Sequence, residues 1–426
     1  MPLPPTLALP ILALTLGHVF SNAVRTIPAV AADVLTRDLG ITDEGLAAIT
    51  GAFPAAFALV MLPVGVALDR YGVRRTALGL LSVGTLGALI AALAQGPLTM
   101  LLGQVVLGIG CSGALMCPTT LAARSMDARR FALWSGLILA LGNMGMLLSA
   151  SPLALLIEWQ GWRAGFLAAA AMAGFAVLAV ALTVPRDAPD RAARAAAPLA
   201  QDVARIWHIA TSPALRPLLV FGFASLAAML GLRGLWGGPW LMEVKGLDRV
   251  EAGNILLLCT VALVAGPAIA GWVHRAVGRT PALMAGSHFI AAALILLILA
   301  GGPGAPLSRL LGLAMLPASW DAAMLVLFGL IISFQVLCFS MVRAAVPPEQ
   351  AGRALSAHNI TFFAGAAILQ AVSGLAAGWA GGGGGVAAAI LTFPVALILC
   401  TTGFLWLRRR AERQRHGSST RLSGRA

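Results

Sequence analysis

The stretch GVALDRYGVRR, residues 65–75, carries the most specific pattern in this chain. Two glycines seven residues apart enclose an adjacent acid and base, Asp69 and Arg70, and a pair of arginines follows. A second stretch, GWVHRAVGR at 271–279, keeps the glycine spacing but has Arg275 where the first has Asp69. The chain is therefore expected to consist of two related halves, each with one copy of this loop.

The composition indicates that the chain is surrounded by a lipid bilayer and not by water. Hydrophobic residues make up 59% of its 426 residues and charged residues 11%, whereas a soluble domain has about 25% charged residues. So few charges leave too little polar surface for a water-soluble particle of this size. At about 20 residues per membrane-spanning helix, the apolar residues suffice for about twelve spans. We expect an all-α integral membrane protein.

Long apolar runs with short polar breaks predict twelve transmembrane helices in two bundles of six. A long polar segment, 185–215, divides them six plus six and is expected to be a linker. The predicted domains are an N-terminal bundle, the linker, a C-terminal bundle and a basic tail, at 1–184, 185–215, 216–410 and 411–426. The predicted spans are 7–33, 42–68, 76–95, 98–122, 131–156, 164–184, 217–241, 252–274, 280–301, 319–342, 354–380 and 386–407.

The net charge of +13 is distributed unevenly over the breaks between these spans. Of the 29 basic residues, 22 lie in the tail or in breaks after even-numbered spans, and five lie in breaks after odd-numbered spans. Cytoplasmic loops carry the excess of positive charge in membrane proteins. The protein is therefore expected in a bacterial inner membrane, with both termini and the linker on its cytoplasmic side. The positive charge is then explained by the orientation of the protein in the membrane. For the basic tail, anionic lipid headgroups are a nearer partner than nucleic acid.

The loop at 65–75, with the six-linker-six layout, resembles the signature of the major facilitator superfamily. The matching residues are Gly65, Asp69, Arg70, Gly72, Arg74 and Arg75. The resemblance implies two parallel repeated halves that hold substrate between them, and a role for this loop in gating. For Arg74 and Arg75, setting the orientation of the protein in the membrane is as good an interpretation as gating. The sequence departs from the family at Arg275 and at Gln104, where many members carry an arginine in span four.

Two arginines, Arg25 in span one and Arg233 in span seven, remain after the loops are counted. A charge inside a membrane rarely faces lipid, and in the family that the chain resembles both spans line the central cavity. Guanidinium groups bind carboxylate or phosphate through two hydrogen bonds. The pair thus resembles organophosphate and organic-anion members and predicts an anionic substrate. Structural alternatives are a partner such as Asp33 for Arg25, and contact with Glu243 or the interface for Arg233.

Further polar and aromatic residues share faces with these arginines. His18, Asn22 and Arg25 lie on one face of a helix, and Pro28 is expected to loosen the helix beyond them. Trp236 and Trp240 share a face with Arg233, either as a wall of the substrate site or as interfacial anchors. Asn143 and His358 are further candidates for substrate contact. Hydrogen bonding between helices is the alternative for such groups.

These residues predict a secondary transporter that moves a small organic anion, a carboxylate or phosphate ester, by alternating access. The alternative is a multidrug efflux transporter, although no acidic residue lies deep in a span. An integral membrane enzyme and a non-transporting sensor of the same fold are further alternatives, and neither a catalytic cluster nor a signalling domain supports them. We expect no enzymatic activity, no cofactor and no metal. The expected partners are a small-molecule substrate and the lipid bilayer but no nucleic acid, and the protein is expected to be a monomer.

Overall fold

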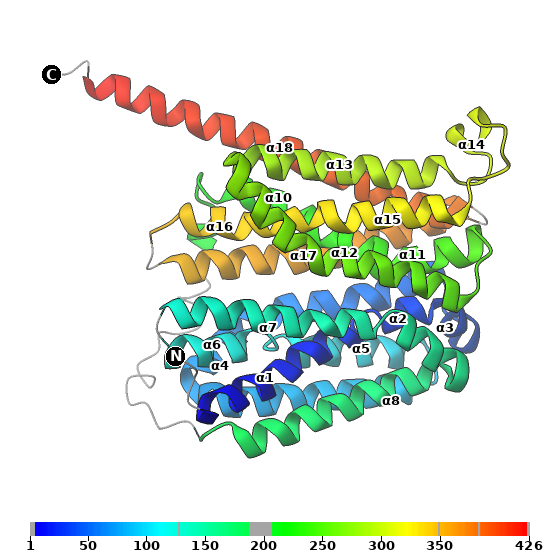
Figure 1. The fold of residues 1–426 in the computed structure, drawn as a ribbon, viewed down its shortest axis with the longest axis horizontal. Helices are drawn as coiled ribbons and strands as arrows, with labels where there is room; N and C mark the ends of the chain where they lie inside the picture. Colours follow the sequence, from blue (N-terminus) through cyan, green and yellow to red (C-terminus); the bar gives the residue numbers. More distant parts are fainter. Residues whose placement is uncertain (1–4, 127, 187–206, 348–349, 382–383, 424–426) are drawn as a thin grey trace.

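The computed structural model of the chain is built from helices arranged in two layers (Figure 1). It describes residues 5–126, 128–186, 207–347, 350–381 and 384–423. Among these residues every regular element is a helix, and the all-α prediction is confirmed. Both termini lie at the left edge of Figure 1, so we call this side of the molecule the termini end and the opposite side the far end.

The lower layer of Figure 1 is the N-terminal half of the chain. Its two longest helices, α4 and α8, each contain one glycine with positive φ, Gly72 at 82° and Gly161 at 77°. Each helix bends there, because the left-handed region breaks the helical path and only glycine enters it without strain. The helices of this half are α1 (Pro5–Val24), α2 (Ile27–Val30), α3 (Ala32–Leu39), α4 (Asp43–Ala92), α5 (Pro97–Cys111), α6 (Met116–Ser125), α7 (Ala128–Leu148) and α8 (Ser151–Thr183).

The upper layer is the C-terminal half. Short π-helical or 3₁₀ turns, labelled η, interrupt several of its helices. The elements are α10 (Arg216–Gly231), η2 (Leu232–Trp236), α11 (Gly237–Pro239), η3 (Trp240–Val244), α12 (Arg249–Val277), α13 (Thr280–Ala300), α14 (Pro306–Leu310), α15 (Ala318–Ile332), η4 (Ser333–Val336), α16 (Leu337–Ala344), α17 (Ala351–Ala380) and α18 (Gly385–Ser423). The linker at 187–206 lies outside the described residues, and α18 extends through most of the predicted basic tail.

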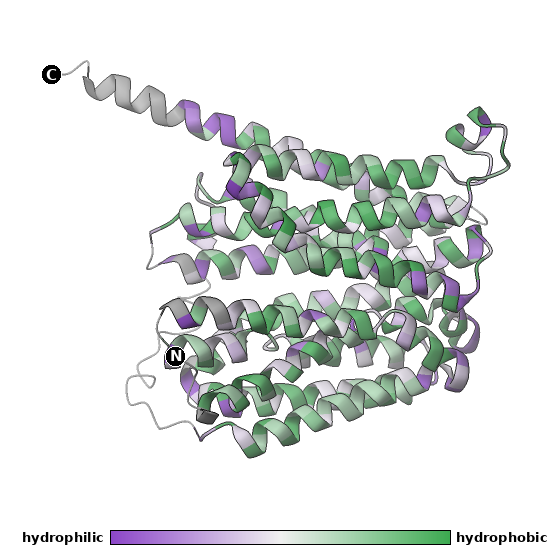
Figure 2. Cartoon of the chain, in the orientation of Figure 1, coloured by the Kyte–Doolittle hydropathy of each residue, from purple (hydrophilic) through white to green (hydrophobic). Residues whose placement is uncertain are grey.

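Many of the helices are long and apolar enough to cross a bilayer. Eleven runs of described residues qualify as membrane spans by length and composition. One of them, Trp134–Thr183, has 50 residues and is about 75 Å long at 1.5 Å per residue, which is twice what a bilayer needs. The bend at Gly161 divides it into the predicted fifth and sixth spans. Hydrophobic residues fill the middle of the helices, and hydrophilic residues gather at both ends (Figure 2).

Local signals set the helix boundaries. Asp248 and Glu251 form a reciprocal capping box at the start of α12, which satisfies two of the free N–H groups there. Gly278 ends the same helix with φ at 68°. This glycine is the repeat of Gly72, so the second glycine of the spaced pair has positive φ in both copies, with ψ at −6° in Gly278 and at 174° in Gly72.

Glycines also allow helices of the N-terminal half to pack closely. A Cβ at Gly108 would overlap the backbone at Phe53, and one at Gly110 would overlap the backbone at Gly84. These glycines of α5 therefore form a packing surface against α4.

Candidate functional site

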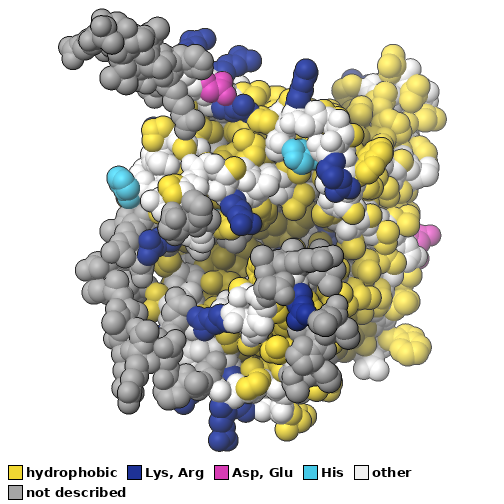
Figure 3. Space-filling model, turned by 60° about the vertical axis from the view of Figure 1, so that its left-hand side comes forward, with side chains coloured by type: hydrophobic (Ala, Val, Ile, Leu, Met, Phe, Trp, Pro, Cys, Tyr) yellow, Lys and Arg dark blue, Asp and Glu magenta, His cyan; other side chains and the backbone are white. Residues whose placement is uncertain are grey.

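A cavity of about 320 Å³ lies between the two halves. Figure 3 brings the termini end forward and shows a hydrophobic recess in the middle of this face, with Lys and Arg side chains around it. The residues that line the cavity come from both halves: His18, Ser21, Asn22, Arg25, Phe57, Met61, Ser112, Ala114, Leu115, Met116, Leu139, Asn143 and Met146 from the first, and Leu226, Met229, Leu263, Pro267, Ser333, Gln335, Val336, Phe339, Asn359, Phe362 and Phe363 from the second.

The polar face of α1 forms one side of this cavity. The Asn22 amide donates a hydrogen bond of 3.0 Å to the carbonyl of Gly142, and its nitrogen lies 3.5 Å from His18 Nε2. Helix α1 ends at Val24, and a new short helix starts at Ile27 with Pro28 in its first turn. The break that Pro28 was expected to cause thus lies next to Arg25. The predicted grouping of His18, Asn22 and Arg25 is found in the cavity wall.

Arg25 is the only cationic side chain among the described residues that line the cavity. Its Nε and Nη2 donate to the carbonyl and hydroxyl oxygens of Ser21 at 3.0 and 3.2 Å, and its guanidinium lies 5.9 Å from the ring centre of Phe53. All these partners are neutral. Asp33, the alternative partner, forms its ion pair with Arg249 instead. A guanidinium so placed retains donors for an anion.

The rest of the cavity wall is apolar with isolated amides. The rings of Phe57 and Phe363, one from each half, stack with centroids 4.0 Å apart. Asn143, Gln335 and Asn359 add amide groups to the wall, and the described lining residues include no aspartate or glutamate. The cavity therefore suits a molecule with a large apolar part and few polar groups.

Arg233 lies outside this lining and bridges the halves. Its side chain is 4% exposed, and Nε donates to Thr260 Oγ1 at 2.7 Å within its own half. Nη1 and Nη2 donate across the interface, to the Thr26 hydroxyl at 3.4 Å, the Met146 carbonyl at 2.7 Å and the Ser149 hydroxyl at 3.2 Å. With its donors used this way, Arg233 is placed to hold the halves together, and its assignment to substrate stays a prediction.

The two tryptophans near Arg233 are buried inside the C-terminal half. Trp236 Nε1 donates to Ser373 Oγ and Trp240 Nε1 to Asp321 Oδ1, both at 2.8 Å. Neither is a lining residue of the cavity, and neither is exposed as an interfacial anchor is. The second oxygen of Asp321 lies 2.9 Å from Lys245 Nζ, in an ion pair whose side chains are 0% and 1% exposed. Sequence reasoning missed this pair because Lys245 lies in a predicted loop and Asp321 at the start of a predicted span.

His358 is also outside the cavity lining. It is fully buried and packs against the rings of Phe339 and Phe362. Both of these phenylalanines line the cavity, so His358 stands one layer behind its wall. Of the eight predicted substrate-contact residues, the cavity brings together His18, Asn22, Arg25 and Asn143.

Contacts between charged groups close the far end of the interface. Arg249 of α12 bonds to the first half three times: Nη2 to Asp33 Oδ2 at 2.7 Å, Nε to Glu158 Oε2 at 3.1 Å, and Nη1 to the Val30 carbonyl at 3.2 Å. Nearby, the Ser151 hydroxyl donates to Asn254 Oδ1 at 2.6 Å. Arg249 and Glu158 lie in breaks between predicted spans and Asp33 at the end of the first span, and only the fold brings them together.

The predicted gating loop is the bend of α4 at the termini end. Arg74 Nη2 donates to the Ala181 carbonyl of α8 at 2.6 Å, which ties the loop to its own half. The Arg70 guanidinium lies 5.6 Å from the ring centre of Tyr71, Arg75 is exposed, and Gly65 is near Met116 of the cavity wall. The side chain of Asp69 lies outside the described residues, so its gating role stays a prediction.

Comparisons with known proteins agree with this architecture. The sequence profile described as Major Facilitator Superfamily matches residues 14–369. The structure resembles that of the nucleoside transporter NupG, with a TM-score of 0.74 and 14% identity over 94% of this chain and 99% of that one. It also resembles a POT family transporter solved with 5-aminolevulinic acid, with a TM-score of 0.75 and 13% identity over 96% and 97% of the two chains. At such identities the likeness is one of fold.

Curated relatives include proteins of drug resistance. A multidrug resistance protein B homolog of Mycobacterium tuberculosis is 31% identical over 41% of this chain and 32% of its own length, so the chain spans about a third of that relative. The tetracenomycin C resistance and export protein of Streptomyces glaucescens is 26% identical over 67% and 62% of the two chains. A probable sulfoacetate transporter, SauU, of Cupriavidus necator is 22% identical over 57% and 59%.

Proposed function

The chain belongs to the Major Facilitator Superfamily, and from this premise we propose that it transports a small organic anion with an apolar body by alternating access. The proposal depends on one observation: Arg25 brings a cation into a cavity whose described lining includes no carboxylate. Inside a low-dielectric cavity, such a charge favours an anionic guest. The carboxylate or phosphate of the substrate would bind Arg25, and its apolar part would contact the methionines and phenylalanines.

We further propose that the protein lies in a bacterial inner membrane and that its termini end faces the cytoplasm. The cationic side chains on that face (Figure 3) and the few acidic ones support this orientation. In this orientation the contacts of Arg233 and Arg249 close the outer side, and the cavity belongs to an inward-facing state. Substrate release to the outside would require those contacts to break while the termini end closes.

Substrate-induced stabilisation of the purified protein tests the role of Arg25. We expect organic carboxylates or phosphate esters with apolar bodies to raise the melting temperature of the wild type. Arg25→Gln should abolish that effect, and Arg25→Lys should keep part of it because lysine retains the charge but not the paired donors. Arg37→Gln is the matched control, since Arg37 lies in an exposed pair with Asp38. Equal stabilisation of wild type and Arg25→Gln would refute the anion site.

Transport itself is measured by counterflow in proteoliposomes. Preloaded substrate should accelerate entry of labelled substrate, and Arg25→Gln should slow it at least tenfold, the effect of losing about 1.4 kcal/mol of binding. Repeating the assay with and without a pH gradient distinguishes proton-coupled transport from exchange.

Export of neutral hydrophobic compounds is the second candidate function. The stacked Phe57 and Phe363 and the four methionines of the cavity wall favour it, because flexible thioether side chains adapt to varied apolar guests. The similarity to resistance proteins supports this second candidate function. If neutral dyes stabilise the protein and Arg25→Gln leaves their affinity unchanged, this candidate replaces the anion.

A further inference from the structure

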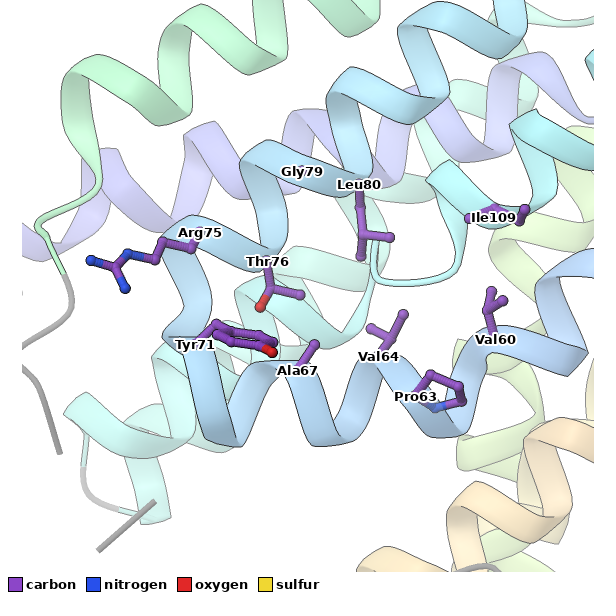
Figure 4. A pocket seen from close by; sticks show the side chains of 10 residues that line it. All are labelled: Val60, Pro63, Val64, Ala67, Tyr71, Arg75, Thr76, Gly79, Leu80 and Ile109. Carbon is purple, nitrogen blue, oxygen red and sulfur yellow. The ribbon is translucent and has the colours of Figure 1, made fainter. Parts of the chain in front are cut away.

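A second, larger hollow of about 450 Å³ lies away from the central cavity, between the two arms of α4. Figure 4 shows its walls: Val60, Pro63, Val64 and Ala67 line one arm, Gly79 and Leu80 the other, and Ile109 of α5 closes its inner part. We call this hollow the α4 groove. Along α4, Phe57 and Met61 face the central cavity, so the groove opens on a different side of the same helix.

The α4 groove is lined by apolar side chains along most of its length and by polar side chains at its mouth. At the termini end, Arg75 extends away from the other lining side chains, with Tyr71 and Thr76 next to it (Figure 4). Arg75 is exposed and forms no hydrogen bond or ion pair with any residue that the structure describes. Tyr71 is 51% exposed, so the mouth offers a free guanidinium and a phenol next to a strip of apolar surface.

We propose that the α4 groove binds an anionic phospholipid of the cytoplasmic leaflet. The phosphate would accept hydrogen bonds from Arg75 at the mouth, and one acyl chain would lie along Val60, Ala67 and Leu80. Charge complementarity selects this occupant, because guanidinium groups pair with phosphate through two hydrogen bonds and the mouth has no described acidic lining residue. The proposal needs the orientation given above only to name the leaflet.

The groove is open at Gly79, where an acyl chain would have room. A Cβ built on Gly79 meets no atom within 4 Å, so the wall between the two arms of α4 is open where an ordinary helix residue would fill it. This differs from Gly108 and Gly110 of α5, where a Cβ would overlap backbone. Gly79 thus keeps space open, and an acyl chain there would gain van der Waals contacts with the groove wall.

Binding to the purified full-length protein tests the proposal. Phosphatidylglycerol should bind to the delipidated protein in detergent, as counted by native mass spectrometry, with higher affinity than phosphatidylcholine of the same acyl chains. Arg75→Gln should weaken phosphatidylglycerol about fivefold, the effect of one arginine at an anionic membrane surface. Arg343→Gln removes an exposed cation elsewhere at the termini end and should change nothing.

Gly79→Leu tests the groove itself. Its side chain enters open space and replaces glycine in a helix, so the protein should melt at or above the wild-type temperature while losing affinity for both lipids. The proposal is overturned if Arg75→Gln binds phosphatidylglycerol as the wild type does, if the two lipids bind equally, or if Gly79→Leu keeps both. Full competition by inorganic phosphate would also overturn it, since that result would identify a site for a free anion.

Discussion

Replacing Arg249 by glutamine should open the far end of the protein. Arg249 begins α12 of the second half, and its three bonds all reach the first half, to Val30, Asp33 and Glu158. These bonds exist only while the far end is closed. Glutamine keeps a polar side chain but is shorter and uncharged, so the substitution affects the closed state and leaves the folding of each half intact.

The burial of the partners sets the size of the effect. The Arg249 side chain is 10% exposed, and those of Asp33 and Glu158 are 39% and 60% exposed. The pair with Glu158 is therefore close to a surface ion pair, at about 0.5 kcal/mol. The shorter and more buried bond to Asp33, together with the Val30 carbonyl, adds about 1.5 kcal/mol. A total of about 2 kcal/mol changes the ratio of open to closed molecules roughly thirtyfold.

Labelling of a buried interface position measures this ratio over a wide range. Ser151 lies in the closed interface, 8% exposed, with its hydroxyl bonded to Asn254. In a Ser151→Cys protein a thiol reagent should react only from the open state, so Arg249→Gln should raise the labelling rate about thirtyfold. The parent protein without Ser151→Cys gives the background from the native cysteines, of which four are buried and Cys400 is half-buried.

Arg37→Gln is the control for the labelling experiment. Arg37 is a cation at the same end, but its described ion pair is with the adjacent Asp38 of its own half. The reasoning is refuted if Arg249→Gln labels at the parent rate, or if Arg37→Gln accelerates labelling as much. Adding Asp33→Asn to Arg249→Gln should change the labelling rate little, because Arg249→Gln already removes the bond to Asp33.

Three further substitutions have outcomes set by the structure. Lys245→Met leaves the buried Asp321 without its cation and should reduce stability by about 3 to 5 kcal/mol; adding Asp321→Asn, which keeps an acceptor for Trp240, should restore most of the melting temperature. Gly110→Ala forces α5 away from Gly84 and should cost about 1 to 3 kcal/mol in thermal melting, whereas Gly79→Ala should be neutral or stabilising. Arg233→Gln should leave substrate affinity in the thermal-shift assay within about twofold of wild type, because Arg233 contacts protein and not the cavity; a loss like that of Arg25→Gln would return Arg233 to the substrate site.

The sequence alone determined the class of fold and its repeat. Low charge and long apolar runs predicted a helical membrane protein, because only helices or barrels satisfy their backbone hydrogen bonds in lipid. The glycine spacing identified Gly72 and Gly278, which both adopt positive φ. On α1, the helical period placed His18, Asn22 and Arg25 on one face, and Pro28 marked the break beside them. These features are local, so short stretches of sequence contain the physical cause.

Only the tertiary structure decided where the remaining charges lie. Arg233 was placed in the cavity by its span, but the π-helical turn η2 lies across its position, and such a turn changes the direction of side chains relative to a regular helix. Arg249 and Lys245 read as loop charges, yet one joins the two halves and the other is buried with Asp321. Their partners lie tens to hundreds of residues away in sequence. No local pattern contains these pairings, because helix packing sets them, within the second bundle for Lys245 and between the bundles for Arg249.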